Sequence, residues 1–153
     1  MATALNFDPG TWNSSVAAPF TLGDLYASGG KTYLYVQLTD AVNATNGMVA
    51  ERASTSSYIV TVDRSGGSAL GRFPKGVFVG NVTAGNFGFV QILGIHSAVK
   101  DAAGALTARV KVISHATTDG DSAPATAYTD ITIGVCLANS SGGVAPVDLW
   151  LGA

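Results

Sequence analysis

The stretch from Gly76 to Gly94 limits the fold of this chain more than any other part of the sequence. It reads Gly-Val-Phe-Val-Gly-Asn-Val-Thr-Ala-Gly-Asn-Phe-Gly-Phe-Val-Gln-Ile-Leu-Gly, so aromatic and β-branched residues alternate with glycine and small polar residues around a Thr-Ala-Gly-Asn turn. This pattern predicts two short paired strands, at 76–79 and 87–93. None of these side chains is suited to acid–base or nucleophilic chemistry, so the stretch favours a surface that binds over a pocket that reacts.

Further strands are expected along the chain, because similar apolar runs alternate with glycine-rich and polar turns. In the clearest run, Lys31–Leu38, the side chains of Tyr33, Tyr35 and Gln37 fall on one face and aliphatic side chains fall on the other. The other predicted strands are 47–53, 57–63, 108–114, 131–137 and 144–151, and 117–126 is the most loop-like segment. With at most a short helical run near 99–106, these about seven to nine short strands predict an all-β, single-domain antiparallel β-sandwich or barrel.

The first 22 residues differ from the rest, because their apolar residues follow neither the strand period nor the helix period. They carry Phe7, Trp12 and Phe20 together with two prolines. We therefore expect an irregular N-terminal arm over 1–22 and a β domain over 23–153. Such an arm is either tied down on its own domain or used to grip a neighbour, and the sequence leaves both open.

Composition argues against several classes of function. Charged residues are 12% of the chain and Glu51 is the single glutamate, which is typical of a protein that works packed against another surface. The eight Lys and Arg residues are scattered and the net charge is −2, so direct nucleic-acid binding is not expected. No apolar run approaches the about 20 residues of a membrane span, and the start lacks the features of a secretion signal, so synthesis in a cytosol is expected.

Residues that could carry chemistry are few and separated in the sequence. His96 and His115 are the only histidines and Cys136 is the only thiol, and their spacing matches no metal motif. Both histidines follow apolar strands and are expected at strand ends near the surface, whereas Cys136 is expected to be a small buried hydrophobe. Asp119 and Asp121 resemble the start of a calcium loop, but the rest of that motif is missing.

A turn in which Asp side chains cap their own backbone is the simpler explanation for these two residues, and the same holds for Asp101. Solvent-facing Tyr33 and Tyr35 would suit a sugar-stacking platform, but aromatic residues on alternating strands more often serve in packing or at an interface. We therefore expect no enzymatic activity, no metal ion and no cofactor.

Three segments together resemble the small head proteins of tailed bacteriophages. They are Gly-Arg-Phe-Pro-Lys-Gly-Val-Phe-Val-Gly at 71–80, Val-Thr-Ala-Gly-Asn-Phe-Gly-Phe-Val-Gln at 82–91, and Ile-Gly-Val-Cys-Leu-Ala at 133–138. The resemblance covers 71–153, and the richness in Ala, Gly, Thr and Val extends it to the composition of the whole chain. The family is that of the capsid decoration, cement or head-stabilising proteins; Cys136 stands where the family carries a smaller residue.

This resemblance implies a virion structural protein on the exterior of the capsid, made in the host cytoplasm. Its partner would be the major capsid protein, whose neighbouring subunits it would bridge and so stabilise by binding only the assembled shell. A homotrimer on a local three-fold axis is the natural geometry. The candidate capsid contacts are Phe7, Trp12 and Phe20, and the candidate oligomer-interface residues are Phe87, Phe89 and Gln91.

Two other functions fit the same features. A head-fibre base or tail component would share the β-rich, charge-poor composition. A carbohydrate-binding β-sandwich module would need an exposed row of aromatic side chains and often a calcium ion.

Overall fold

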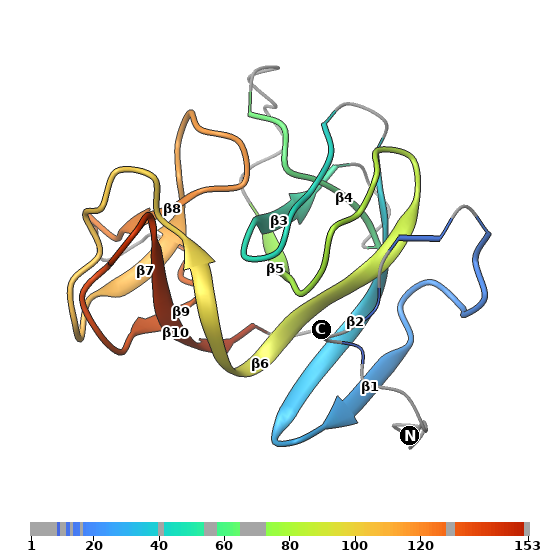
Figure 1. The fold of residues 1–153 in the computed structure, drawn as a ribbon, viewed down its shortest axis with the longest axis horizontal. Helices are drawn as coiled ribbons and strands as arrows, with labels where there is room; N and C mark the ends of the chain where they lie inside the picture. The colour runs from blue at the N-terminus through green and yellow to red at the C-terminus, as the bar shows by residue number, and fades with distance from the viewer. Residues whose placement is uncertain are drawn as a thin grey trace.

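The computed structural model describes residues 9, 12, 14–15, 17–39, 42–53, 58–64, 73–127 and 131–151 (Figure 1). These residues contain no α-helix, and their strands form one sheet of order β1-β2-β4-β3-β5-β6-β10-β9-β7-β8. The prediction of an all-β fold is confirmed. The strands are β1 (Leu25–Ser28), β2 (Lys31–Leu38), β3 (Val49–Arg52), β4 (Ile59–Thr61), β5 (Pro74–Phe78), β6 (Phe87–Lys100), β7 (Lys111–Ser114), β8 (Ser122–Pro124), β9 (Gly134–Cys136) and β10 (Val144–Trp150).

Five of these strands close into a small barrel, because β2 pairs with β6 as well as with β4. An odd number of strands cannot alternate in direction all the way around, so one neighbouring pair must be parallel. That pair is β2 and β4, and the other pairs of the barrel are antiparallel. The barrel is filled by buried side chains that include Leu34, Val36, Leu38, Val60, Phe78, Val90 and Ile92.

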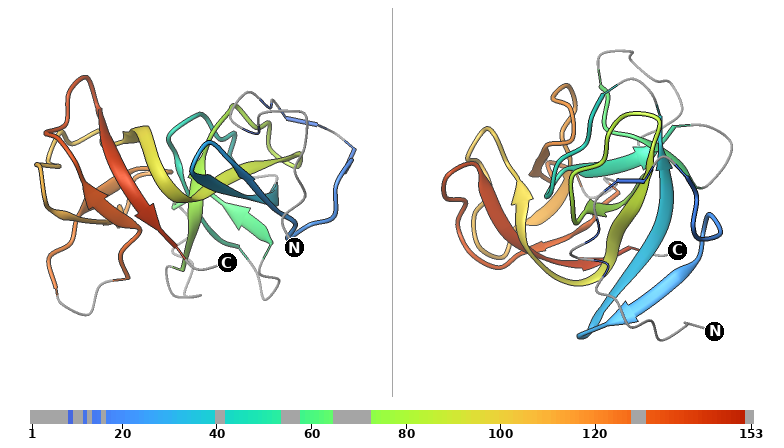
Figure 2. Two further views of the ribbon diagram at one scale, coloured as in Figure 1. Left: turned by 90° about the horizontal axis from the view of Figure 1, so that it is seen from below. Right: turned by 45° about the vertical axis from the view of Figure 1, so that its right-hand side comes forward.

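The second half of β6 leaves the barrel and begins an open sheet with β10, β9, β7 and β8. Figure 2 shows these orange and red strands beside the barrel, with the yellow β6 running from one lobe into the other. The inner side of this open-sheet lobe is a second core, which includes Val99, Leu106, Val112, Ile133, Val147 and Leu149. One strand therefore belongs to both lobes.

Gly94 lies where β6 passes from the barrel to the open sheet. Its φ is 86°, and a Cβ at this position would lie 2.6 Å from the carbonyl oxygen of Gly30. A register irregularity falls beside it, between Thr32 and Tyr33 of β2 where they pair with β6. Glycine at 94 is needed here because the left-handed backbone and the close approach both exclude a larger residue.

The structure differs from the predicted strands in three places: one strand is longer, and two strands were not predicted. The pairing of 76–79 with 87–93 is confirmed, but β6 continues to Lys100, where Gly94 and the polar residues after it hide the strand pattern. β1 was not predicted, and β8 lies inside the segment expected to be a loop. β8 is a three-residue edge strand containing Pro124, and edge strands tolerate turn-forming residues because one side makes no ladder. In the region 99–106, residues 99 and 100 end β6 and residues 101–106 form a turn and irregular chain without a helix.

No helix in the described part of the chain is long and apolar enough to span a membrane.

Candidate functional site

An aromatic layer covers the outer face of the sheet where β1, β2 and the first half of β6 lie side by side. Tyr26 pairs with Tyr33, and Tyr35 pairs with Phe89, so the rings lie in rows across three strands. All four rings are buried. The alternation predicted for 31–38 is confirmed, but Tyr33 and Tyr35 do not face solvent, which removes them as a sugar-stacking platform.

The N-terminal arm supplies the cover of this layer. The Phe20 ring lies 5.2 Å from the Tyr35 ring and 5.7 Å from the Phe89 ring, measured between centroids, and the Trp12 ring lies 6.0 Å from that of Phe89. A bridge between Ser15 and Phe87 ties the arm's backbone to the start of β6. In this structure Trp12 and Phe20 are therefore tied down on their own domain, whereas Phe7 lies outside the described residues.

The three residues proposed for an oligomer interface lie on the same face. Phe89 and Gln91 are each 1% exposed, and Phe87 is half-buried beneath the arm. The structure thus brings five of the six predicted contact residues into one neighbourhood. Within a single chain, their main contacts are with one another and with neighbouring strands.

Among the described residues, no segment covers the outward side of the second half of β6. Leu93 and Ile95 are 48% and 52% exposed, and Trp150, directly opposite Leu93 on β10, is 44% exposed. We call these three residues the apolar patch. The patch was not predicted, although the alternation of Leu93 and Ile95 with Gly94 and His96 indicates a strand with one outward apolar side.

A polar cavity of about 130 Å³ lies between residues of β2, the middle of β6 and two loops. It is lined by Lys31, Tyr33, Asn46, Val79, Gln91, His96 and Ser97. We call it the basic pocket, because Lys31 is its single charged group at neutral pH. None of its lining residues carries a carboxylate.

His96 forms a wall of the basic pocket and is 4% exposed, so the expectation of a surface strand end was wrong. Its Nε2–H donates to the Phe78 carbonyl oxygen at 3.2 Å, and its Nδ1 accepts from the Ala98 N–H at 3.2 Å. Burial lowers the pKa of His96 to about 4, the Phe78 bond opposes this, and the nearby Lys31 charge lowers it further. The ring is therefore neutral at neutral pH, and both of its nitrogens are occupied.

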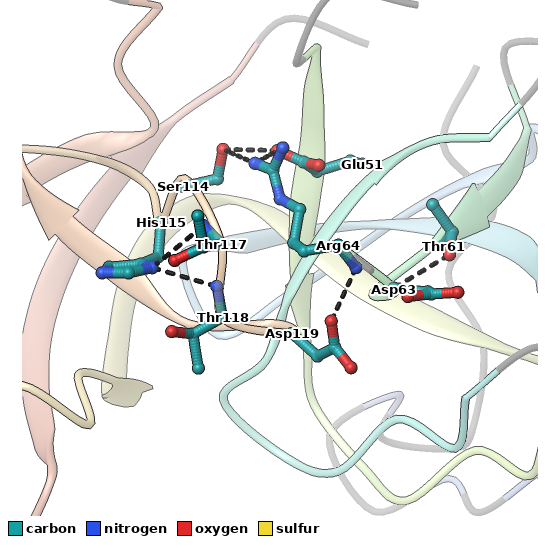
Figure 3. Close-up of polar contacts among 9 residues, drawn as sticks. All are labelled: Glu51, Thr61, Asp63, Arg64, Ser114, His115, Thr117, Thr118 and Asp119. Atoms are coloured by element: carbon teal, nitrogen blue, oxygen red, sulfur yellow. Dashed lines mark hydrogen bonds and ion pairs between the residues drawn. The ribbon is translucent and has the colours of Figure 1, made fainter. Parts of the chain in front are cut away.

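A second polar cluster joins the two lobes (Figure 3). The Arg64 guanidinium pairs with the carboxylate of Glu51 on β3 and donates to Ser114 Oγ on β7 at 2.7 Å, while Ser114 also donates to Glu51. We call these three residues the brace. A salt bridge this little exposed needs both partners, because either charge alone would be left buried.

Asp119 also contacts this region, because its Oδ1 accepts from the Arg64 backbone N–H at 2.6 Å. Asp119 was expected to cap its own turn, but the N–H that it accepts from belongs to Arg64, in the other lobe. His115 follows β7 as predicted, and its Nδ1 accepts from the N–H groups of Thr117 and Thr118 in the next turn. These contacts are shown in Figure 3.

Cys136 and Asp101, the remaining residues that could carry chemistry, make local contacts that stabilise the fold. Cys136 is fully buried, as expected; its Sγ–H donates to the Ala138 carbonyl oxygen at 2.9 Å, and burial raises the pKa of its thiol. Asp101 Oδ2 accepts from the Leu106 N–H at 2.8 Å, which fits the local turn predicted for it. In the described ranges, no three His, Cys, Asp or Glu side chains gather closely enough to hold a metal ion.

Comparison with known proteins yields a match in structure but not in sequence. No protein-family model matches the chain, and a search of curated proteins also finds no match. The fold is similar to that of the N base of the head fibre protein gp8.5 of bacteriophage phi29, with a TM-score of 0.51 and 12% identity. The match covers 78% of this chain and 93% of that one, so nearly the whole neighbour shares this arrangement of strands.

Proposed function

We propose that this chain is a structural protein of a tailed-phage virion that attaches to the outer surface of the capsid and carries out no catalysis. The observation that supports this most is the fold shared with a head-fibre base over 93% of that protein's chain. A low content of charged residues and the apolar patch are consistent with a protein that works against another surface.

The more specific proposal is a decoration role, in which the chain bridges neighbouring subunits of the major capsid protein. The resemblance of 71–153 to decoration proteins supports it. A protein that binds the assembled shell but not free subunits stabilises the shell by mass action. Assembly as a homotrimer would add affinity through effective concentration, since three linked contacts form together.

A head-fibre base is the second candidate, and the structural match favours it directly. It differs from a decoration protein in what is attached to it, because a base carries a fibre whereas a decoration protein is itself the outermost layer of the particle. The two roles share the capsid as partner and the exterior as location.

The arm is the proposed capsid contact, through Phe7, Trp12 and Phe20. Because Trp12 and Phe20 already pack on the aromatic layer, the arm would dock in a preformed position and lose little conformational entropy on binding. The half-buried Trp12 ring keeps part of its surface for a partner.

The test is to add labelled protein to undecorated phage heads and image the particles by electron cryomicroscopy. Icosahedrally ordered density over the shell supports decoration, and density that continues into a fibre supports a base. A protein lacking residues 1–19 is expected to remain folded by circular dichroism but to leave heads bare. Heads that the full chain does not bind contradict the proposal, and normal binding by the shortened chain contradicts the role of the arm.

A further inference from the structure

The open sheet exposes large apolar side chains on one of its two faces. Its inner face belongs to the second core, which also contains Val49 of β3 and Val77 of β5, so the barrel lies on that side. The opposite side, which we call the outer face, carries the apolar patch and Leu137, which is 45% exposed. Exposed apolar side chains gathered on adjacent strands are typical of a surface that contacts another protein.

The strand register arranges the outer face in rows that cross β6, β10, β9, β7 and β8. One row contains, in this order, Ile95, Asp148, Val135, Lys111 and Ala125. Asp148 pairs with Ile95 on one side and with Val135 on the other. Lys111 pairs with Val135, and its carbonyl oxygen accepts from the Ala125 N–H at 2.8 Å. Side chains of paired residues lie on the same face of a sheet, so the whole row belongs to the outer face.

The next row along the strands has the same distribution of side-chain size. Leu93 on β6 pairs with Trp150 on β10, and Ile113 on β7 pairs with Ala123 on β8. In both rows β6 therefore carries a large aliphatic residue, whereas β8, at the other edge of the sheet, carries an alanine. The outer face is raised over β6 and β10 and low over β8, with β9 in the middle.

The charges on this face are placed symmetrically about β9. Asp148 and Lys111 are both exposed, and each lies one strand away from Val135. Because neighbouring strands are about 4.8 Å apart, the two charges lie at similar distances on either side of β9. If a second copy faces the first across a two-fold axis along β9, Asp148 of each copy therefore lies over Lys111 of the other.

The same rotation matches the two copies in size. It places Ile95 of one copy over Ala125 of the other, and Leu93 over Ala123, so a large residue meets a small one at both edges. Val135 lies on the axis and meets its own counterpart. A surface that is complementary to itself in both size and charge is what a two-fold contact requires, because one patch serves both copies.

We propose that the outer face of the open sheet binds a second copy of this chain, with the two-fold axis along β9 and the two sheets packed face to face. Nearly aligned sheets about 10 Å apart are a common packing in β-sandwiches. The footprint of the two rows is on the order of 300 Å², smaller than the about 800 Å² per partner of a standard complex. The contact is therefore weak in dilute solution and strengthens where copies are held side by side. It uses a different face from the residues proposed for the homotrimer, so the two contacts are compatible.

The first experiment reverses the charges. The weight-average mass of the full chain, measured by sedimentation equilibrium at low salt, is expected to rise with concentration up to the millimolar range. Asp148→Lys and Lys111→Glu are each expected to weaken this association at least about tenfold, because like charges then meet twice. An equimolar mixture of the two variants is expected to recover it, since each positive position again faces a negative one. Lys75→Glu, which makes the same charge change on β5, is the control and is expected to have little effect. A mixture that associates no better than its components overturns the two-fold pairing, and an unaltered chain of constant mass overturns the contact itself.

The second experiment tests the match in size by the same measurement. Ala125→Phe fills the space that Ile95 of the other copy takes, and it is expected to weaken association at least about tenfold. Ala102→Phe, the same change at an exposed turn position, is expected to leave association unchanged. Association that survives Ala125→Phe overturns the placement of β8 over β6. Matching thermal midpoints establish that each variant is folded. Neither experiment involves phage heads, so its result is independent of whether the proposed function holds.

Discussion

The two halves of β6 both carry large apolar side chains, but these side chains lie in opposite environments. From Gly88 to Ile92 every residue is buried, because the barrel core lies on one face and the aromatic layer with its arm lies on the other. In the second half, Leu93 and Ile95 lie open to solvent while Val99 is buried in the open-sheet core. Burial on both faces thus depends on whether a covering segment exists, not on the strand alone.

This contrast separates two uses of apolar surface in one protein. The first half has its cover within the chain, so its side chains stabilise the fold. The second half has no cover among the described residues, so its side chains are free to contribute to binding. Substitutions in the first half are therefore expected to change stability, and those in the second half are expected to change association.

The largest effect is expected at the centre of the covered half. Phe89→Ala removes a buried ring that contacts those of Trp12, Phe20, Tyr26 and Tyr35, and it is expected to lower the free energy of unfolding by about 4 kcal/mol. The measurement is urea unfolding at neutral pH, with Leu93→Ala from the bare half as the matched control. If both substitutions lower the free energy of unfolding by a similar amount, the contrast between the two halves of β6 is wrong.

The next effect concerns the link between the lobes. Arg64→Met leaves the Glu51 carboxylate buried without its counter-charge, and it is expected to destabilise the protein by about 3 kcal/mol. Adding Glu51→Gln is expected to recover part of this loss. Chemical unfolding followed by probes in each lobe is the measurement, and a variant as stable as the unaltered chain would mean that the brace does not hold the lobes.

A pH effect of similar size is expected at the point where the two halves meet. Histidine in the unfolded chain has a pKa of about 6.5, whereas burial lowers the pKa of His96 to about 4. Protons therefore bind the unfolded chain preferentially below pH 6.5, and stability falls by roughly 3 kcal/mol as the pH falls toward 4. His96→Gln is expected to remove this part of the pH dependence. An unchanged slope in that variant would contradict the burial of the ring.

A smaller effect is expected where the arm contacts the aromatic layer. Phe20→Ala removes a half-buried ring and is expected to cost about 2 kcal/mol, because the layer loses several edge-to-face contacts. Phe73→Ala, which removes a phenylalanine that is 46% exposed and lies 5.5 Å from the Arg52 guanidinium, is the control and is expected to cost less than about 1 kcal/mol. Thermal unfolding with near-ultraviolet circular dichroism distinguishes the two.

The smallest effect on stability is expected in the bare half. Ile95→Lys introduces a charge on an exposed strand position and is expected to change the free energy of unfolding by no more than about 0.5 kcal/mol. Binding to phage heads is expected to fall sharply in the same variant. If stability falls and binding does not, the patch is part of the folded core and the contrast between the halves is wrong.

The strands that could be predicted from sequence are those whose faces differ strongly in residue type. The strand Lys31–Leu38 was predicted with the bounds that the structure shows, because tyrosines alternate there with aliphatic residues. β8 was missed because serine and proline usually indicate a loop when the strand that a segment pairs with is not known. Closure of the barrel also has no local signal, since it depends on pairing between β2 and β6 across distant parts of the chain.

The candidate site was less predictable than the fold. The aromatic residues of the arm and of β6 were identified as important, but their packing on each other is a long-range contact. His96 was placed at the surface because Gly94 and Ser97 interrupt the apolar pattern around it. The basic pocket combines residues from β2, β6 and two loops, so no spacing in the sequence indicates it.

The continuity of β6 also has a mechanical consequence. A force applied to the open-sheet lobe reaches the barrel along one uninterrupted backbone of 14 residues, rather than through a flexible tether. The ladders to β2 and β10 run along this strand, so tension along β6 loads many hydrogen bonds in shear at the same time. A molecule anchored by one lobe and pulled by the other is therefore expected to yield slowly, with a lifetime governed by its unfolding rate.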